Sequence, residues 1–214
     1  MLVFPIFQPL DVFGPIDALQ ILSWEHKLDL YMIGPTLDPV STATLDPAWN
    51  TTGAKFGVTI QPTHTYDNIP DDLDVLLVPG GAGAFRTTAN IEPMVEVIKK
   101  VYPRLKYLIG ICNGSGLLAA SGILDGKKAT TTKPFWKRTT AMGPNVDWVH
   151  RARFVVDGNI WTSSGVSSGI DLTVAWMAHV YGQEEAQRIA NQMEYVWNSD
   201  PNKDPFVDIF GEGM

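Results

Sequence analysis

The single cysteine of this 214-residue chain, Cys112, stands where an apolar-rich segment, residues 107–111, gives way to small residues. The preceding segment favours a buried strand and residues 114–121 favour a helix. Gly110 and Gly114 flank the cysteine with the spacing of a nucleophile elbow, a sharp turn that needs small neighbours. The sequence therefore predicts a nucleophilic thiol at a strand-to-helix turn.

The acidity of this thiol depends on its surroundings. A cysteine near a helix N-terminus lies close to unpaired N–H groups and the positive end of the helix dipole, which favour the thiolate. The alternative is a buried, inert cysteine, since free cysteine is among the most buried residue types. On the first interpretation Cys112 is a reactive nucleophile.

Backbone N–H groups near the thiol are candidate oxyanion donors. Gly80 and Gly81 follow an apolar strand, and Asn113 follows the cysteine, so their N–H groups could face a developing negative charge. An ordinary turn also explains the glycines. The segment lacks the Gly-x-Gly-x-x-Gly and Gly-x-x-x-x-Gly-Lys spacings of phosphate-binding loops.

Asp11 is the candidate acid. A carboxyl group held protonated beside sulfur can hydrogen-bond the thiolate and transfer a proton. Aspartate is also a common N-cap, and Asp11 directly precedes an expected helix over residues 12–24. Both roles remain open for Asp11 at this point.

The elements that must position these groups alternate along the chain. Strands are expected at residues 2–7, 28–33, 74–78 and 105–111, with helices at 12–24, 90–102, 114–121, 170–181 and 184–197. An Asp-Gly turn at 157–158 indicates a hairpin over residues 154–162.

Near-continuous apolar strands alternating with helices indicate an α/β fold with a mostly parallel sheet covered on both faces. Ligands bind such sheets outside the carboxyl ends of the strands. The segments 8–11, 79–83 and 112–115 each follow a strand, so we expect them to meet at one site.

Composition limits the class of protein. The length and a hydrophobic content of 45% suit one globular domain, residues 1–214. A formal net charge of -7 and a pI near 5.0 argue against a nucleic-acid partner. The cluster of basic residues is interpreted as a solvated face; it comprises Lys127, Lys128, Lys133, Lys137 and Arg138.

No disulfide framework is possible with one cysteine, and the four scattered histidines do not form a zinc motif with it. We therefore expect no metal and no cofactor. The N-terminal apolar segment is too short for a membrane span and no basic leader precedes it, so we expect no membrane partner and a cytoplasmic location.

Several motifs, in this order, give a resemblance that spans nearly the whole chain. They are residues 7–15 (FQPLDVFGP), 78–83 (VPGGAG), 110–115 (GICNGS), 122–131 (GILDGKKATT), 157–159 (DGN) and 162–171 (TSSGVSSGID). The chain resembles the ThiJ/PfpI superfamily, a branch of the class I glutamine amidotransferase-like fold. Within it, the pattern is most similar to isonitrile hydratase-like members, including fungal ones.

The resemblance implies a flavodoxin-like three-layer sandwich that forms a homodimer. It also implies that Cys112 is the nucleophile and Asp11 its acidic partner. Two positions depart from the family pattern. Asn113 follows the nucleophile where isonitrile hydratases usually have threonine, and Thr132 stands where many relatives have histidine.

The missing histidine weighs against a peptidase or amidotransferase, which needs a base to relay a proton to the leaving amine. The leading hypothesis is a cofactor-free, cysteine-dependent lyase or hydratase that converts an isonitrile, a small molecule, to an N-substituted formamide. One alternative is glyoxalase- or deglycase-like chemistry on reactive aldehydes. Another is a non-catalytic protein that senses oxidants through Cys112.

Overall fold

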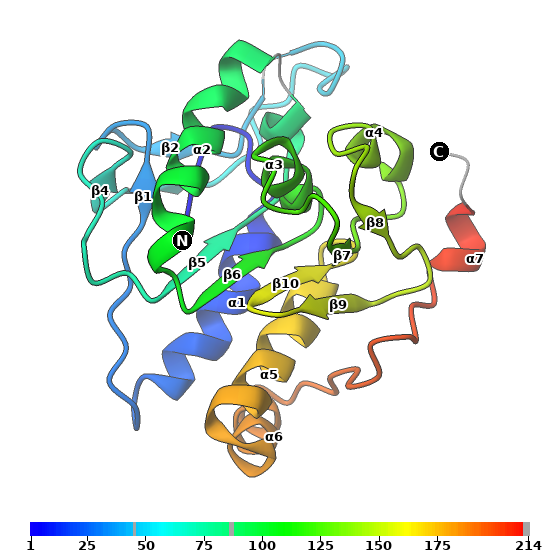
Figure 1. Ribbon diagram of the computed structural model, residues 1–214. Coiled ribbons are helices and arrows are strands. Elements are labelled where there is room, and N and C mark those ends of the chain that lie inside the picture. Colours follow the sequence, from blue (N-terminus) through cyan, green and yellow to red (C-terminus); the bar gives the residue numbers. More distant parts are fainter. Residues whose placement is uncertain (45, 86–87, 212–214) are drawn as a thin grey trace.

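A parallel sheet forms the centre of the protein (Figure 1). The computed structural model describes residues 1–44, 46–85 and 88–211. The strands of the central sheet are, in spatial order, β5 (Val75–Val78), β6 (Tyr107–Gly110), β10 (Ile160–Ser163) and β9 (Phe154–Asp157). The first three are parallel, and β9 returns antiparallel to β10 as the predicted hairpin.

The sheet is extended beyond β5 by the start of the chain. Residues 1–4 lie between β5 and β1 (Ile33–Gly34), because the Leu2 N–H donates to Leu77 O at 2.9 Å and the Val3 N–H to Ile33 O at 2.8 Å. β1 pairs in parallel with β4 (His64–Thr65). The strand predicted over residues 2–7 is therefore not continuous, since Leu2 and Phe7 form only isolated bridges. Of the strand predicted over residues 28–33, only the last residue is part of a strand, β1.

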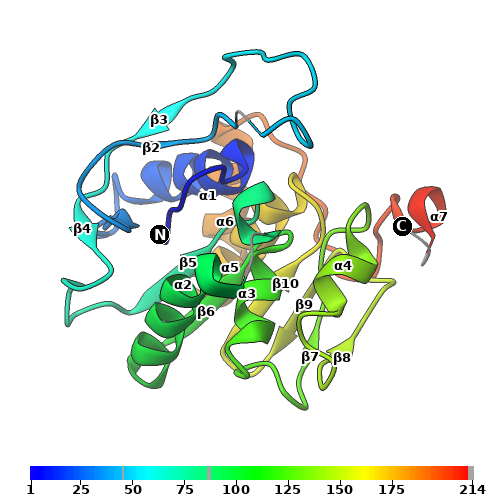
Figure 2. The ribbon, with the colours of Figure 1, turned by 90° about the horizontal axis from the view of Figure 1, so that it is seen from above.

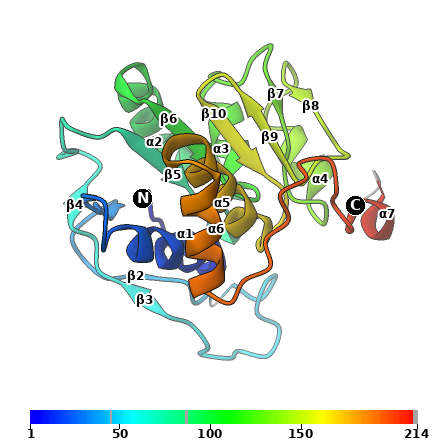
Figure 3. The ribbon, with the colours of Figure 1, turned by 90° about the horizontal axis from the view of Figure 1, so that it is seen from below.

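Helices cover both faces of the sheet (Figures 1 and 3). One face carries α1 (Pro9–Leu22), α5 (Ser168–Tyr181) and α6 (Gln183–Gln192). The other carries α2 (Thr88–Val101) and α3 (Gly114–Ala120). The predicted α/β sandwich with helices on both faces is confirmed.

Two helix boundaries differ from the sequence prediction. α1 begins at Pro9 rather than at residue 12, because proline is favoured at the first helical position, and it continues past Pro15. This shift places Asp11 inside the first turn of α1. α6 ends at Gln192, and residues 195–200 continue as an irregular tail.

Short elements surround the sheet (Figure 2). They are β2 (Val40–Ser41) paired with β3 (Thr59–Ile60), β7 (Lys128–Ala129) paired with β8 (Asp147–Trp148), the helices α4 (Trp136–Thr140) and α7 (Val207–Phe210), and the 3₁₀ turns η1 (Ala82–Phe85) and η2 (Tyr102–Arg104). Within the described residues, no helix combines the length and hydropathy needed to cross a membrane.

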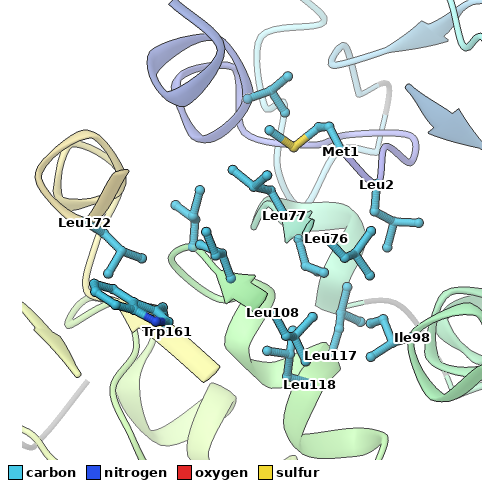
Figure 4. Packing of buried hydrophobic residues seen from close by; sticks show 14 of the residues in the cluster. Met1, Leu2, Leu76, Leu77, Ile98, Leu108, Leu117, Leu118, Trp161 and Leu172 are labelled. Atoms are coloured by element: carbon cyan, nitrogen blue, oxygen red, sulfur yellow. The ribbon is translucent and has the colours of Figure 1, made fainter. Parts of the chain in front are cut away.

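The core alternates across the central strands (Figure 4). Leu76 and Leu108 point toward Leu117 and Leu118 of α3, whereas Leu77 lies toward Met1 on the opposite face. All are buried. Since β5, β6 and β10 are buried on both sides, residues with chemical function are placed at the ends of these strands rather than within them.

The start of α3 generates a first prediction. A methyl group on Gly114 would overlap the carbonyl oxygens of Val78 and Pro79, and neither backbone group can move without disturbing the end of β5. We expect Gly114→Ala to lower the free energy of unfolding by about 3 kcal/mol, measured by urea denaturation. The matched control is Gly122→Ala, where φ is +78° but no atom lies within 4 Å of the added methyl; here we expect about 1 kcal/mol. Equal losses would contradict the role of close approach at Gly114.

Candidate active site

Cys112 occupies a strained turn between β6 and α3. Its φ of 56° is in the left-handed region, which side-chain-bearing residues adopt rarely. The Cys112 carbonyl accepts hydrogen bonds from Ser115 Oγ at 2.9 Å and Thr131 Oγ1 at 3.1 Å. The Ile111 N–H donates to Val78 O at 2.9 Å, so contacts on both sides hold the turn. The sharp turn predicted for Cys112 is confirmed.

The sulfur of Cys112 is surrounded by hydrogen-bond donors. These are the Thr132 hydroxyl and the backbone N–H groups of Asn113 and Val166, each of which favours the thiolate. They come from three separate segments, which follow β6, β7 and β10. The convergence of strand carboxyl ends at one site is therefore present in the structure.

Burial nevertheless dominates the acidity of the thiol. Cys112 is 5% exposed, and desolvation, together with the negative charge of Asp11, raises the pKa of the thiol to about 12. The three donors and the start of α3 do not compensate for the loss of water. The prediction of an acidified thiol is therefore wrong: the resting group is the neutral thiol.

Asp11 lies beside this thiol and is completely buried. Its Oδ2 accepts the Gly80 N–H at 2.9 Å, and its Oδ1 has no hydrogen-bond partner among the described residues. Burial raises the pKa of Asp11 to about 7, while the Gly80 N–H and the nearby Cys112 thiol partly oppose the shift. The N-cap interpretation is wrong, because Gln8 is the N-cap and the Asp11 side chain reaches Gly80 instead.

The two groups form one titrating pair. Below pH 7 the pair holds two protons, and between pH 7 and about 12 it holds one. In the one-proton form, moving that proton from sulfur to Asp11 creates a thiolate next to a neutral carboxylic acid. This arrangement combines a nucleophile with an acid, both desolvated.

The glycines at the end of β5 have a different role from the one predicted. The Gly80 N–H is used by Asp11, and the Gly81 N–H donates to Asn113 Oδ1 at 2.8 Å. Asn113 Nδ2 returns a hydrogen bond to Gly81 O at 2.9 Å. A Cβ on Gly80 would lie 2.9 Å from both Asp11 Oδ2 and Asn113 N, so only glycine fits here. Of the three predicted oxyanion donors, only the Asn113 N–H faces the sulfur in this arrangement.

Sequence reasoning missed two of the sulfur's partners. The sequence marks position 132 only by a threonine where many relatives have histidine, yet the Thr132 hydroxyl contacts the Cys112 sulfur. Val166 gave no signal, because a backbone N–H can belong to any residue other than proline. The small-residue segment around it, residues 163–169, was part of the resemblance and was the only available indication.

Lys133 is fully buried, so the interpretation of the basic cluster as a solvated face is wrong for this residue, whereas Lys128, Lys137 and Arg138 are exposed. Its Nζ donates to Thr130 Oγ1, Thr131 O and Ala152 O at 3.1–3.2 Å. It also lies 3.4 Å from Asp204 Oδ2. Burial lowers the pKa of Lys133 to about 8, although Asp204 opposes this shift.

The histidines are engaged away from the thiol. His26 contacts Glu185, His64 contacts Thr63, His150 contacts Gly211, and His179 packs on Tyr107 and Trp161. Among the described residues, no group of three or more His, Cys, Asp or Glu side chains is arranged to hold a metal ion. Within the part of the chain that the structure describes, the ionisable side chain that contacts the Cys112 thiol is Asp11.

Two cavities lie apart from the thiol. One, of about 620 Å³, is lined by Met1, Leu19, Tyr107 and Trp176, at the edge of the sheet where β5 and β6 begin. The other, of about 860 Å³, is lined by Pro35, Val40, Trp49, Ile6, Phe85 and Arg138, among others. Cys112 and Asp11 line neither cavity.

A parallel α/β sandwich with a cysteine at a strained strand-to-helix turn and a buried carboxyl group beside it defines a class of proteins. The DJ-1/PfpI family model matches residues 1–179. The chain belongs to the DJ-1/PfpI family, as the resemblance predicted.

Individual relatives agree with this assignment. Isonitrile hydratase of Pseudomonas putida is 32% identical over 197 residues, which cover 91% of this chain and 77% of that protein. A deglycase of Pyrococcus abyssi is 35% identical over 124 residues, 58% of this chain and 70% of that protein. The crystal structure of a ThiJ/PfpI family protein from Pseudomonas syringae superposes with a TM-score of 0.72 at 29% identity, covering 95% of this chain and 76% of that one. The family thus includes enzymes.

The burial of Asp11 generates a prediction about stability. Its pKa in the folded state lies above the value of 3.8 that it has in water, so the folded state holds the proton more tightly, and this stabilisation is lost as pH rises toward 7. We expect Asp11→Asn to be more stable than the wild type at pH 8, by at most about 4 kcal/mol, and the difference to shrink near pH 4. Urea unfolding at both pH values measures this. Asp17→Asn, at an exposed position of α1, is the control, and a pH-independent difference would contradict the assignment.

The contact between the Thr132 hydroxyl and the Cys112 sulfur generates a prediction about reactivity. We expect Thr132→Val to raise the thiol pKa and to lower the alkylation rate of Cys112 by iodoacetamide by about tenfold at pH 8, because a hydrogen bond to the thiolate is lost. Mass spectrometry follows the reaction, and no second cysteine contributes. Thr140→Val, in α4, is the matched control, since its hydroxyl bonds Lys137 O instead. An unchanged rate in Thr132→Val would exclude the contact.

Proposed function

We propose that this protein is a cysteine-dependent isonitrile hydratase, which adds water to a small isonitrile and releases the N-substituted formamide. The observation that carries the proposal is the buried Asp11–Cys112 pair with one unbonded carboxyl oxygen and no histidine contacting it among the described residues. Hydration of a neutral substrate needs a nucleophile and a group that both gives and takes a proton. It does not need a base to expel an amine.

The first step forms the carbon–sulfur bond. The proton of Cys112 moves to Asp11, the thiolate attacks the terminal carbon of the isonitrile, and Asp11 returns the proton to that carbon. The product is a thioimidate bound to Cys112. Desolvation favours this step, since a thiolate and a neutral carboxylic acid in an apolar site react with an uncharged electrophile without first shedding water.

Water completes the reaction. The Asp11 carboxylate accepts a proton from the water that attacks the thioimidate carbon and passes this proton to the nitrogen. The carbon–sulfur bond then breaks, Asp11 transfers the hydroxyl proton of the tetrahedral intermediate to the sulfur, and the thiol is restored as the formamide leaves. The N–H groups of Asn113 and Val166 and the hydroxyl of Thr132 stabilise the sulfur as it departs with negative charge.

Similarity supports this reaction over the alternatives. The isonitrile hydratase relative aligns over 91% of the chain, whereas the deglycase of Pyrococcus abyssi aligns over 58% of it. An oxidant sensor is expected to have an acidic thiol, whereas burial raises the pKa of the Cys112 thiol. Isonitrile hydration therefore fits both the comparison and the site.

Formamide production from a panel of alkyl and aryl isonitriles tests the proposal. We expect turnover by the wild type, none by Cys112→Ala, and a loss of about 10²- to 10⁴-fold in kcat/KM for Asp11→Asn. Asp17→Asn should match the wild type. No turnover on any member of the panel, or turnover that survives Cys112→Ala, would overturn the proposal. Consumption of methylglyoxal by the wild type, without turnover of any isonitrile, would instead support glyoxalase- or deglycase-like chemistry.

The pH profile provides a second test. Only the one-proton form of the pair can react, so kcat/KM should rise with an apparent pKa near 7 and stay level across the mildly alkaline range. Residual activity of Asp11→Asn should lack this rising limb. A limb that persists in Asp11→Asn would assign the titration to another group.

A further inference from the structure

Two loops bring donors to the sulfur of Cys112, and neither donor lies in a strand of the central sheet. Residues 130–133 follow β7 and carry Thr132, while residues 164–167 follow β10 and carry Val166. The loops touch, since a Cβ on Gly165 would lie 3.2 Å from Thr132 Oγ1. Their relative position therefore decides how well both donors reach the sulfur.

One side chain from the C-terminal tail contacts both loops. Asp204 lies between α6 and α7, in the segment that runs back past β9 toward α4 (Figures 1 and 3). Its Oδ2 accepts a hydrogen bond from Ser164 Oγ at 2.6 Å and lies 3.4 Å from Lys133 Nζ. Ser164 is two residues from Val166, and Lys133 is the neighbour of Thr132.

Asp204 is itself held in one position. Its side chain is fully buried, and its Oδ1 accepts the Phe206 N–H at 3.2 Å and lies 3.9 Å from the Arg153 guanidinium. Arg153 also pairs with Asp171 at 2.7 Å. Two buried cations thus meet two buried carboxylates, and each charge has a counter-charge that offsets the cost of removing it from water.

We propose that Asp204 is a positioning residue that keeps the Thr132 hydroxyl and the Val166 N–H directed at the Cys112 sulfur by joining their two loops through Lys133 and Ser164. Its effect on the thiol is independent of the reaction assigned above; only its effect on turnover rests on the proposed function.

The direction of the effect separates positioning from simple electrostatics. Removing a negative charge near a thiol lowers the thiol pKa, because the thiolate is repelled less. Withdrawing two hydrogen bonds raises it. Asp204→Asn removes the charge but keeps an oxygen that can accept from Ser164, so it weakens the link through Lys133. Asp204→Ala removes both links.

Alkylation of the single cysteine by iodoacetamide, followed across pH by mass spectrometry, tests the proposal without any substrate. We expect the rate at each pH below the thiol pKa to fall by about tenfold in Asp204→Asn and further in Asp204→Ala, with a smaller loss in Ser164→Ala. If the substitutions only loosened the two loops, the sulfur would become more exposed and its alkylation rate would increase. An unchanged or increased rate in Asp204→Asn and Ser164→Ala would overturn the proposal.

A stability control completes the design, because uncompensated burial of Lys133 costs folding free energy. Ile98 lies on the buried side of α2, on the opposite face of the sheet from α5, and we expect Ile98→Ala to lower stability by a comparable amount. It should leave the alkylation profile unchanged, and a fall equal to that of Asp204→Asn would assign the effect to lost stability. Should Asp204→Ala fail to fold, Asp204→Asn and Ser164→Ala decide the question. Failure of isonitrile turnover would leave this result unaffected.

Discussion

Removal of water from one carboxyl group and one thiol is the constraint on which the site depends. Asp11 and Cys112 are both buried, so the charged form of each is disfavoured, and a negative charge on one also disfavours a negative charge on the other. Their pKa values rise for the same physical reason, and above pH 7 the pair shares a single proton. In this one-proton form the sulfur is a thiol, and a thiolate forms only when the proton moves a short distance to Asp11.

The fold supplies this environment by placing rigid elements on either side. Asp11 is fixed in the first turn of α1 and bonded to the end of β5, while Cys112 is held in a left-handed conformation between β6 and α3. Gly114 allows α3 to begin against the backbone at the end of β5. The strain at Cys112 is maintained because the strand before it and the helix after it are packed on the core.

The remaining contacts to the sulfur depend on a neutral cluster of buried charges. Lys133, Arg153, Asp171 and Asp204 come from segments far apart in the chain, and together they join the C-terminal tail to the loops after β7 and β10. Such a cluster contributes little net stability relative to an apolar core, but removing one member leaves a buried charge without a partner. Its geometric specificity is therefore more important here than its energy.

Local pattern was sufficient for much of the fold. The units around β5 and β6 and the hairpin of β9 and β10 were predicted because apolar runs, glycine turns and helix stops are encoded by neighbouring residues. The start of α1 was predicted three residues too late, and that error kept the N-cap role open for Asp11. The strand at residues 28–33 was overestimated, since pairing depends on a partner that is distant in sequence.

The sequence by itself determined the family, the α/β class, the turn at Cys112 and the pairing of that residue with Asp11, because motifs and spacing carry these. Only the tertiary structure decided that the thiol is neutral, that Gly80 and Gly81 serve Asp11 and Asn113, and that Lys133 is buried next to the site. The physical reason is that charge, pKa and hydrogen-bond availability depend on how much water remains around a group. That is fixed by segments far away in the chain, such as the tail that carries Asp204.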